Sequence, residues 1–308
     1  MSGEARSRGE ATIRARPEGM SGEARSRGEA ATRAVGLRIA GRPMPALVLV
    51  SLVGLVAFGW PLLARHPGTG VGHDVDAPWL FAALLPLLIL VLLAELTSGG
   101  VDAKAVAMLG VLAALGTALR PFGAGITGFQ PMFALLVIGG RALGPGFGFV
   151  LGATTMFSSA LLTGGIGPWL PFQMIAAAWT GLGAGLLPRA TGRREILLLS
   201  AYAGASGVAY GFLMNLWFWP FQTGTASSLA FVAGAPLGEN LTRFLAFSVA
   251  TSLGYDLVRG IGNALLVVLF GGPALRALRR AVRRASFGAV AQFDAPASAV
   301  APVSSEAA

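Results

Sequence analysis

An acidic and a basic residue, Asp256 and Arg259, stand three positions apart inside a long apolar run, flanked by Tyr255 and Asn263. On a helix this spacing puts both charges on neighbouring positions of one face, where they can pair. Charged residues inside a membrane-spanning helix are costly and usually face a cavity, a ligand or each other. The pattern therefore leaves two interpretations open, a self-neutralising structural pair and a contact to a polar ligand.

Amide and aromatic side chains gather at the ends of other apolar segments. An amide close to lipid needs hydrogen-bond partners, and flat rings offer stacking surfaces for a ligand. We expect Gln130, Trp169, Gln173 and Asn215 to floor an outward cavity with flat stacking surfaces and a few fixed polar groups. Because Trp is common at membrane boundaries, Trp217 and Trp219 are interpreted as interface anchors instead.

Small residues recur every four positions along one segment, at Gly110, Ala114 and Ala118, and Ala103 and Ala107 extend them. Such a ladder lets a second helix approach closely in lipid. By itself it favours internal packing over a partner interface. The glycine-rich stretch 140–152 predicts a tight turn between two closely packed helices, with Pro145 beginning the second.

Composition excludes several kinds of chemistry. The chain has no cysteine, hence no disulfide, thiolate metal site or cysteine nucleophile. Its single lysine is Lys104 and no GxxxxGK[ST] motif occurs, which argues against ATP hydrolysis by this chain. His66 and His73 share one polar loop and are expected to be ordinary solvated residues, so we predict no metal and no cofactor. A membrane enzyme would need clustered carboxylates, whereas those near the apolar segments are scattered: Glu95, Asp102, Glu195, Glu239 and Asp256.

The elements that must position these residues are membrane-spanning helices. Of the 308 residues, 54% are hydrophobic and 12% charged, whereas soluble domains carry about a quarter charged residues. Crossing a bilayer takes about 20 helical residues. Eight apolar segments are predicted, at about 46–64, 79–96, 105–119, 131–140, 144–163, 168–187, 196–219 and 244–270. The fourth is short, which leaves open whether it spans fully.

The distribution of basic residues predicts the orientation. With a cytoplasmic N-terminus and eight spans, all but four of the 23 basic residues fall on the cytoplasmic side. Arg65, Arg120 and Arg243 fall outside, and Arg259 lies within the last span. The positive-inside rule therefore favours both termini in the cytoplasm of a plasma-membrane protein. Since the arginines lie at the chain ends and between apolar segments, the net charge of +9 does not indicate nucleic-acid binding.

Loops and tails complete the expected organisation. Residues 1–43 are polar and repeat the sequence MSGEARSRGEA, which predicts a disordered basic cytoplasmic tail; residues 285–308 are predicted to be a second disordered tail. Residues 44–98 are predicted to form an N-terminal transmembrane hairpin before a helical core at 99–284. The outward loop 220–242 is rich in small and polar residues, as expected for a mobile cover over a site.

Three stretches carry a family resemblance. They are FQPMFALLVIGGRALGPGFGFVLGATTMFSSALLTG from Phe129, GIGPWLPFQMIAAAWTGLGAGLLPR from Gly165, and LGYDLVRGIGNALLVVLFGGPALRALRR from Leu253. From about Lys104 to Arg284 the chain resembles the substrate-binding membrane subunit, or S component, of energy-coupling factor (ECF) transporters. Two spans before Lys104 and the Arg-rich tail depart from that pattern.

The resemblance implies an all-α integral membrane protein with a six-helix core, here preceded by two extra transmembrane helices. It implies capture of a vitamin or similar micronutrient, and docking on a transmembrane coupling subunit (T component) above two cytoplasmic ATPases. Sites in the family lie under the outer loops, between core helices and the last helix. This implies the substrate-binding residues Gln130, Trp169, Gln173, Asn215, Asp256, Arg259 and Asn263. In the family the docking surface uses small residues spaced by four on the first core helix, which assigns the ladder at 103–118 to a partner. The alternatives are a self-contained secondary transporter, for which no clear inverted repeat is found, and another kind of polytopic membrane protein.

Overall fold

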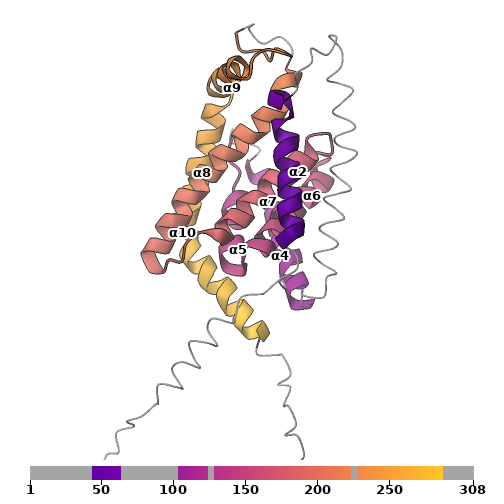
Figure 1. The fold of residues 1–308 in the computed structure, drawn as a ribbon. Helices are drawn as coiled ribbons and strands as arrows, with labels where there is room; N and C mark the ends of the chain where they lie inside the picture. The colour runs from indigo at the N-terminus through magenta and orange to yellow at the C-terminus, as the bar shows by residue number, and fades with distance from the viewer. Residues whose placement is uncertain (1–43, 64–102, 124–127, 223–227, 287–308) are drawn as a thin grey trace, which may run out of the picture. The chain divides into compact units, whose positions relative to one another are not determined.

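The computed structural model describes residues 44–63, 103–123, 128–222 and 228–286, which all belong to one compact unit, residues 37–308. Every regular element in this part of the chain is a helix, as predicted, and two short 3-10 turns follow α4 and α8 (Figure 1). The α-helices are α2 (Met44–Leu63), α4 (Ala103–Leu119), α5 (Met132–Leu143), α6 (Pro145–Thr163), α7 (Leu170–Leu186), α8 (Gly192–Phe218), α9 (Leu237–Thr251) and α10 (Leu253–Ser286).

Four of these helical regions are long and apolar enough to cross a membrane: Lys104–Gly123, Pro145–Thr163, Gly192–Phe221 and Leu253–Arg283. The chain is thus an all-α multi-pass membrane protein. Helix α5 has 12 residues, fewer than the roughly 20 that a span needs, so the fourth segment is short as predicted. The segment at 79–96, the predicted tail 1–43 and residues 287–308 lie outside the described residues, and the count of eight spans stays a prediction. Residues 285 and 286 of the second predicted tail are the last residues of α10.

Three helices meet through an ion-pair cluster at one end of the core. Glu195, in the first turn of α8, is buried and pairs with Arg141 near the end of α5 at 2.7 Å. Arg279 from the last third of α10 donates to both carboxylate oxygens, at 2.6 and 3.0 Å. We call this the Glu195 end. The start of α5, the end of α8 and the start of α10 lie at the opposite end, which we call the Arg259 end.

Glycine brings α5, α6 and α7 into close contact. At the turn between α5 and α6, Gly144 has a φ of +102°, a conformation that favours glycine, and Pro145 opens α6 as predicted. Further along, Gly148 of α6 faces Gly181 of α7, and a Cβ on either residue would collide with the backbone of the other. The two backbones therefore touch directly, which is how small residues hold helices together where lipid gives no hydrophobic drive.

Helix α2 packs on α7 beside this core. The rings of Phe58 and Phe172 lie 5.1 Å apart in an edge-to-face arrangement, and both side chains are buried. Trp179 donates its indole N–H to Ser51 Oγ at 3.0 Å. Helix α2, the first of the two extra N-terminal segments, is thus held against α7 by specific contacts.

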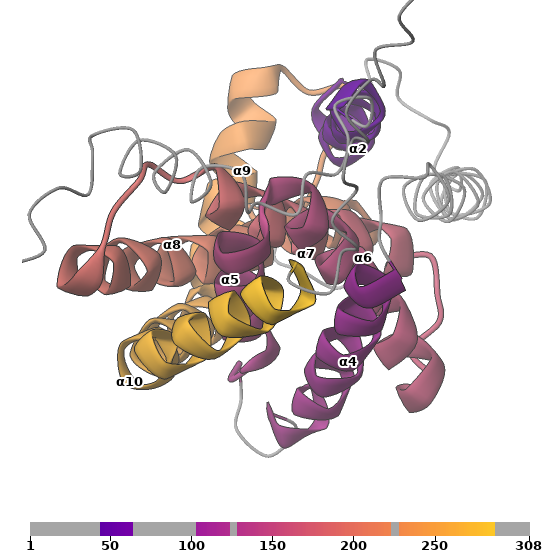
Figure 2. The ribbon, with the colours of Figure 1, turned by 90° about the horizontal axis from the view of Figure 1, so that it is seen from below.

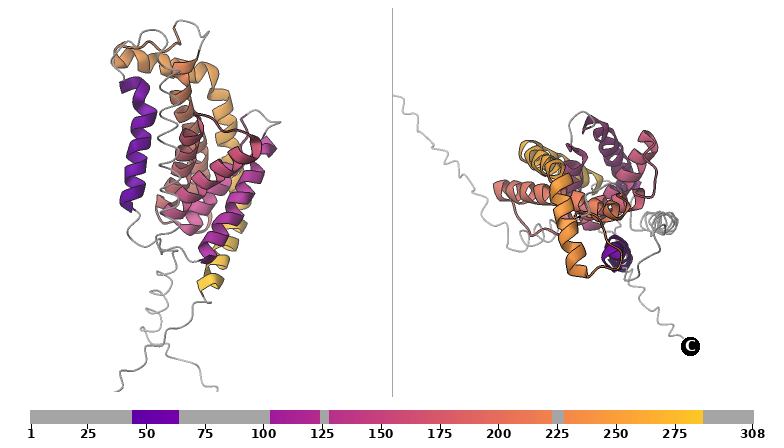
Figure 3. Two further views of the ribbon diagram at one scale, coloured as in Figure 1. Left: turned by 90° about the vertical axis from the view of Figure 1, so that its right-hand side faces the viewer. Right: turned by 90° about the horizontal axis from the view of Figure 1, so that it is seen from above.

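The predicted last span, 244–270, is wrong as a single helix. The helix is interrupted at Ser252, where α9 ends and α10 begins. Helix α9 lies across the end of the neighbouring helices (Figure 3, left, orange). Hydropathy conceals this break, because α9 contributes its own apolar residues, Phe244 and Phe247, to a cluster with Trp219. Since α9 begins at Leu237, the loop expected at 220–242 is also shorter than predicted.

The interpretation of Trp217 and Trp219 as lipid-facing anchors is wrong too. Their exposed fractions are 7% and 1%. Trp219 donates its indole N–H to Leu229 O at 2.7 Å and packs on Phe231 and Phe244. Trp217 packs on Phe172 and Phe221. Both rings therefore serve as packing surfaces within the Arg259 end rather than as membrane anchors.

Candidate functional site

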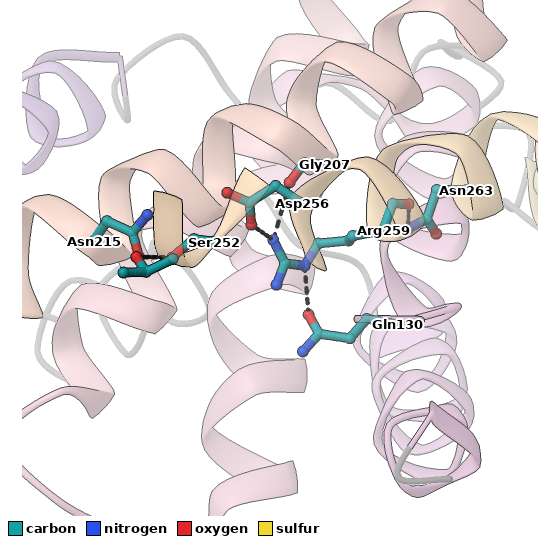
Figure 4. A network of polar contacts seen from close by, with 8 residues as sticks. Gln130, Gly207, Asn215, Ser252, Asp256, Arg259 and Asn263 are labelled. Atoms are coloured by element: carbon teal, nitrogen blue, oxygen red, sulfur yellow. Dashed lines mark hydrogen bonds and ion pairs between the residues drawn. The ribbon is translucent and has the colours of Figure 1, made fainter. Parts of the chain in front are cut away.

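Arg259 is the centre of a buried polar network that joins α5, α8 and α10 (Figure 4). Its Nη1 pairs with Asp256 Oδ1 at 2.7 Å and donates to Gly207 O on α8 at 3.3 Å. Its Nε donates to Gln130 Oε1, just before α5, at 3.0 Å. The guanidinium also lies 5.3 Å from the ring centre of Tyr210. The charge is therefore neutralised and hydrogen-bonded within the protein, as an ion in a low dielectric requires.

Asn263 extends the network one turn further along α10. It is fully buried, accepts a hydrogen bond from Ala134 N at 2.8 Å and donates to Arg259 O at 2.7 Å. Four of the seven predicted site residues, Gln130, Asp256, Arg259 and Asn263, are thus brought together. Their mutual bonds make them a rigid scaffold.

The remaining three predicted residues line one pocket of about 290 Å³. Trp169 and Gln173 come from the start of α7, and Asn215 comes from the last turn of α8; Met214, Trp217 and Phe218 complete the lining. The rings of Trp169 and Trp217 are 6.4 Å apart and nearly perpendicular. The pocket thus offers flat apolar walls with a few amide groups, the combination typical of small-molecule sites.

Ser252, at the break between α9 and α10, connects the pocket to α10. Its hydroxyl donates to Asn215 Oδ1 at 3.0 Å (Figure 4), one turn before Asp256. The Nδ2 of Asn215 is buried and has no hydrogen-bond partner among the described residues. Ser252, at the helix break, thus holds the amide oxygen of Asn215, and the amide N–H groups make no hydrogen bond to a described residue.

Sequence reasoning missed Arg120, which counts there only as a basic residue of an outer loop. The residue directly follows α4, and its guanidinium turns inward to α6 and α7. Its Nη1 donates to the buried Ser159 Oγ at 2.5 Å, and its Nη2 donates to Gln173 Oε1 at 3.4 Å. The only feature of the sequence that could have indicated this role is the position of Arg120, directly after the helix that carries the small-residue ladder.

The small-residue ladder lies on an exposed face of α4. Ala107, Gly110, Ala114 and Ala118 are all exposed, whereas Ala105, Leu109 and Leu112 face the core. A Cβ at Gly110 would meet nothing within 4 Å. Ala103 is the first residue of α4. Figure 2 shows α4 and α8 on opposite sides of α5. The ladder therefore does not serve packing against the described helices.

Among the described residues, no group of three or more His, Cys, Asp or Glu side chains lies together to hold a metal ion. His66 and His73 fall outside that part of the chain. The described site is thus one of amides, rings and arginines.

Comparison with known proteins identifies the class. The family described as "ECF transporter, substrate-specific component" matches residues 104–282, which cover more than half of the chain. The chain belongs to this family, and the predicted resemblance is confirmed. No curated protein and no solved structure matches the chain significantly. The protein is therefore a substrate-binding subunit of an ECF transporter, and the α2 segment precedes the part that the family covers.

Proposed function

We propose that this subunit captures a vitamin or similar micronutrient outside the cell and passes it to a T component energised by two cytoplasmic ATPases. Family membership supports association with these subunits. Capture of the micronutrient is supported by one observation: a pocket of rings and amides joins a buried polar network at the Arg259 end. Fixed polar groups among apolar walls give a small ligand its orientation.

The seven predicted site residues divide into two roles in this proposal. Trp169, Gln173 and Asn215 contact the ligand, because they line the pocket. Gln130, Asp256, Arg259 and Asn263 are positioning residues, because their polar groups bond to one another and to the backbone of α5, α8 and α10. They act on the ligand by fixing the end of α8 and the start of α10.

The T component docks on the exposed ladder of α4 in this proposal. Side chains of one carbon or none at Ala107, Gly110, Ala114 and Ala118 let a partner helix approach the backbone closely, and Ala103 continues the same spacing. The larger exposed residues beside the ladder, Val111 and Leu115, would pack around such a helix. No described helix covers this face, which leaves it available to a partner.

The Arg259 end faces the outside of the plasma membrane, and both termini lie in the cytoplasm. This orientation is supported by the charge at the Glu195 end, where described arginines are exposed around the helix termini: Arg189, Arg193, Arg194, Arg276, Arg280 and Arg283. Helix α10 has 34 residues, about 50 Å at 1.5 Å per residue. It exceeds the hydrocarbon thickness of about 30 Å, so its arginine-rich last third can extend into water.

The proposal is tested by separating binding from transport. The subunit is purified in detergent, the small molecule that co-purifies is identified by mass spectrometry, and its binding is measured by calorimetry. Uptake is then measured in liposomes that hold either the subunit alone or the subunit with its T component, ATPases and ATP. We expect binding by the subunit alone and accumulation only by the full assembly. Accumulation against a gradient by the subunit alone would instead indicate a secondary transporter.

A further inference from the structure

Every buried or half-buried arginine in the described chain contacts a carboxylate, with one exception. Arg259 pairs with Asp256, Arg243 pairs with Glu239, and Arg141 and Arg279 share Glu195. Arg120 is the exception, since its two described partners, Ser159 and Gln173, are both neutral. The Arg259 end therefore carries an excess of one positive charge among its described residues.

The direction of the Arg120 side chain argues against a role as a lipid anchor. A long basic side chain at the end of a span usually extends outward to the headgroups. Arg120 instead reaches α6 and α7, and the Ser159 hydroxyl that it contacts is fully buried. A guanidinium has five N–H donors, and these two bonds leave others free. A partly buried cation without a counter-ion is costly, so an anionic partner would stabilise it strongly.

The pocket adjoins this unbalanced charge and offers another free donor. Gln173 belongs to both, because it lines the pocket and accepts the hydrogen bond from Arg120. Asn215 lines the same pocket, and its buried Nδ2 lacks an acceptor among the described residues. Buried donors without acceptors are rare in native proteins. A buried amide donor without an acceptor and a half-buried guanidinium with neutral partners, both beside one pocket, favour a ligand rich in acceptor oxygens.

We propose that the substrate carries an oxyanion, a carboxylate or a phosphate, which binds Arg120, and an apolar or flat part that lies against Trp169 and Trp217. Asn215 Nδ2 donates to an acceptor on the same ligand. The inference rests on the proposed capture function and adds the chemical class of the substrate. A pocket of about 290 Å³ fits a small molecule or the recognised part of a larger one.

The test compares what the wild type and two arginine variants retain. Wild type, Arg120→Gln and the control Arg243→Gln are purified from the same host, and retained small molecules are identified by mass spectrometry. Arg243 has its own carboxylate partner on α9, so its loss tests the general effect of removing a charge. We expect wild type and Arg243→Gln to retain one anionic compound, and Arg120→Gln to bind it about 10- to 100-fold more weakly, as for a lost charge-assisted hydrogen bond.

A second measurement needs no variant. The retained compound is titrated into wild type beside its neutral derivative, the amide of a carboxylate or the dephosphorylated form of a phosphate, which also distinguishes the two oxyanions. Equal affinity of both forms, or retention of a compound without an oxyanion, would overturn the inference while leaving the capture function standing. If wild type retains nothing, and no carboxylated or phosphorylated vitamin raises its melting temperature, the capture function fails and the inference fails with it.

Discussion

The side chain of Asn263 on α10 caps the first turn of α5, accepting a hydrogen bond of 2.8 Å from the backbone N–H of Ala134, 129 residues away in the sequence. Helix α5 has no side-chain cap of its own, and the N–H groups of a first helical turn lack the regular acceptor four residues back. Within its own turn the Ala134 N–H makes only a longer bond of 3.2 Å to Pro131 O. The cap is supplied by another helix. The start of α5 and the first third of α10 are therefore joined directly, with Gln130 and Arg259 beside this contact.

Removal of this cap should destabilise the protein. Asn263→Ala removes two buried side-chain hydrogen bonds, to the Ala134 N–H and the Arg259 carbonyl, while the Ala134 N–H keeps its bond to Pro131 O. Each lost bond should cost about 0.5–1.5 kcal/mol. Thermal unfolding in detergent should show a clear fall in melting temperature. Ser206→Ala is the matched control, since it removes only a local hydrogen bond of 3.3 Å to Ala203 O and should change little. Equal effects of the two substitutions would contradict the role of the cap.

The Asp256–Arg259 pair should behave as a coupled unit. Asp256→Asn or Arg259→Gln alone leaves a buried charge without its counter-ion, which costs about 3–5 kcal/mol. The double variant removes both charges, so its destabilisation should be less than the sum of the single effects by about 0.5–3 kcal/mol. A double-mutant cycle by denaturant unfolding measures this coupling. Additive effects would show that the two side chains act independently despite their separation of 2.7 Å.

The single variants of this pair should also weaken ligand binding, because they loosen the start of α10, beside Ser252, which holds Asn215 of the pocket. Calorimetric titration with the co-purified compound measures the loss. Unchanged affinity in both Asp256→Asn and Arg259→Gln would remove the pair from the positioning role.

A bulky side chain on the α4 ladder should block assembly without affecting capture. Ala114→Trp fills the space that a partner helix would occupy, so co-purification with the T component should be lost while ligand affinity stays unchanged. Leu197→Trp is the control, since Leu197 is 66% exposed and lies on α8, on the opposite side of α5 (Figure 2). Normal assembly of Ala114→Trp would place the docking surface elsewhere.

The close contact of α6 and α7 should not tolerate a methyl group. In Gly181→Ala the added Cβ meets the backbone of Gly148, so the helices must separate, and the cost should be about 1–3 kcal/mol or more as in other overpacked cores. Gly238→Ala tests the effect of the residue type alone, because nothing lies within 4 Å of a Cβ there. Melting temperatures in detergent compare the two, and a stable Gly181→Ala would show that this contact can relax.

Truncation of Trp169 should affect the ligand more than the fold. Its exposed fraction is 39%, so Trp169→Ala should lower the melting temperature only slightly, yet it removes a wall of the pocket worth about 1 kcal/mol or more of ligand affinity. Phe122→Ala is the control, a ring that is 75% exposed and does not line the pocket. Calorimetry on both variants measures the difference. Equal affinities would argue that the ligand binds away from Trp169.

The membrane class and most helix positions could be predicted from the sequence. Segments predicted at 105–119 and 144–163 correspond to α4 and α6 within about two residues. The reason is local: in lipid every backbone polar group must be satisfied within its own helix, so apolar runs of sufficient length become helices. The turn at Gly144-Pro145 was predictable for the same reason, because its backbone conformation depends on those two residues.

Residue types alone also indicated most of the candidate site, because amides and charges near lipid need partners whatever the fold. They left open which partners these are. The pairing of Arg259 with Gln130, across 129 residues, divides the site into a scaffold and a pocket. The inward turn of Arg120 toward Gln173, the burial of Trp217 and the break at Ser252 likewise depend on contacts between distant helices.

The amino-acid sequence by itself therefore determined that this chain lies in a membrane, where its helices run and which residue types are available for recognition. Only the tertiary structure decided which charges are neutralised, which donors stay free and which face of α4 is exposed. Helix formation in lipid is governed by hydrogen bonds within each segment, whereas these properties arise from the packing of one helix against another.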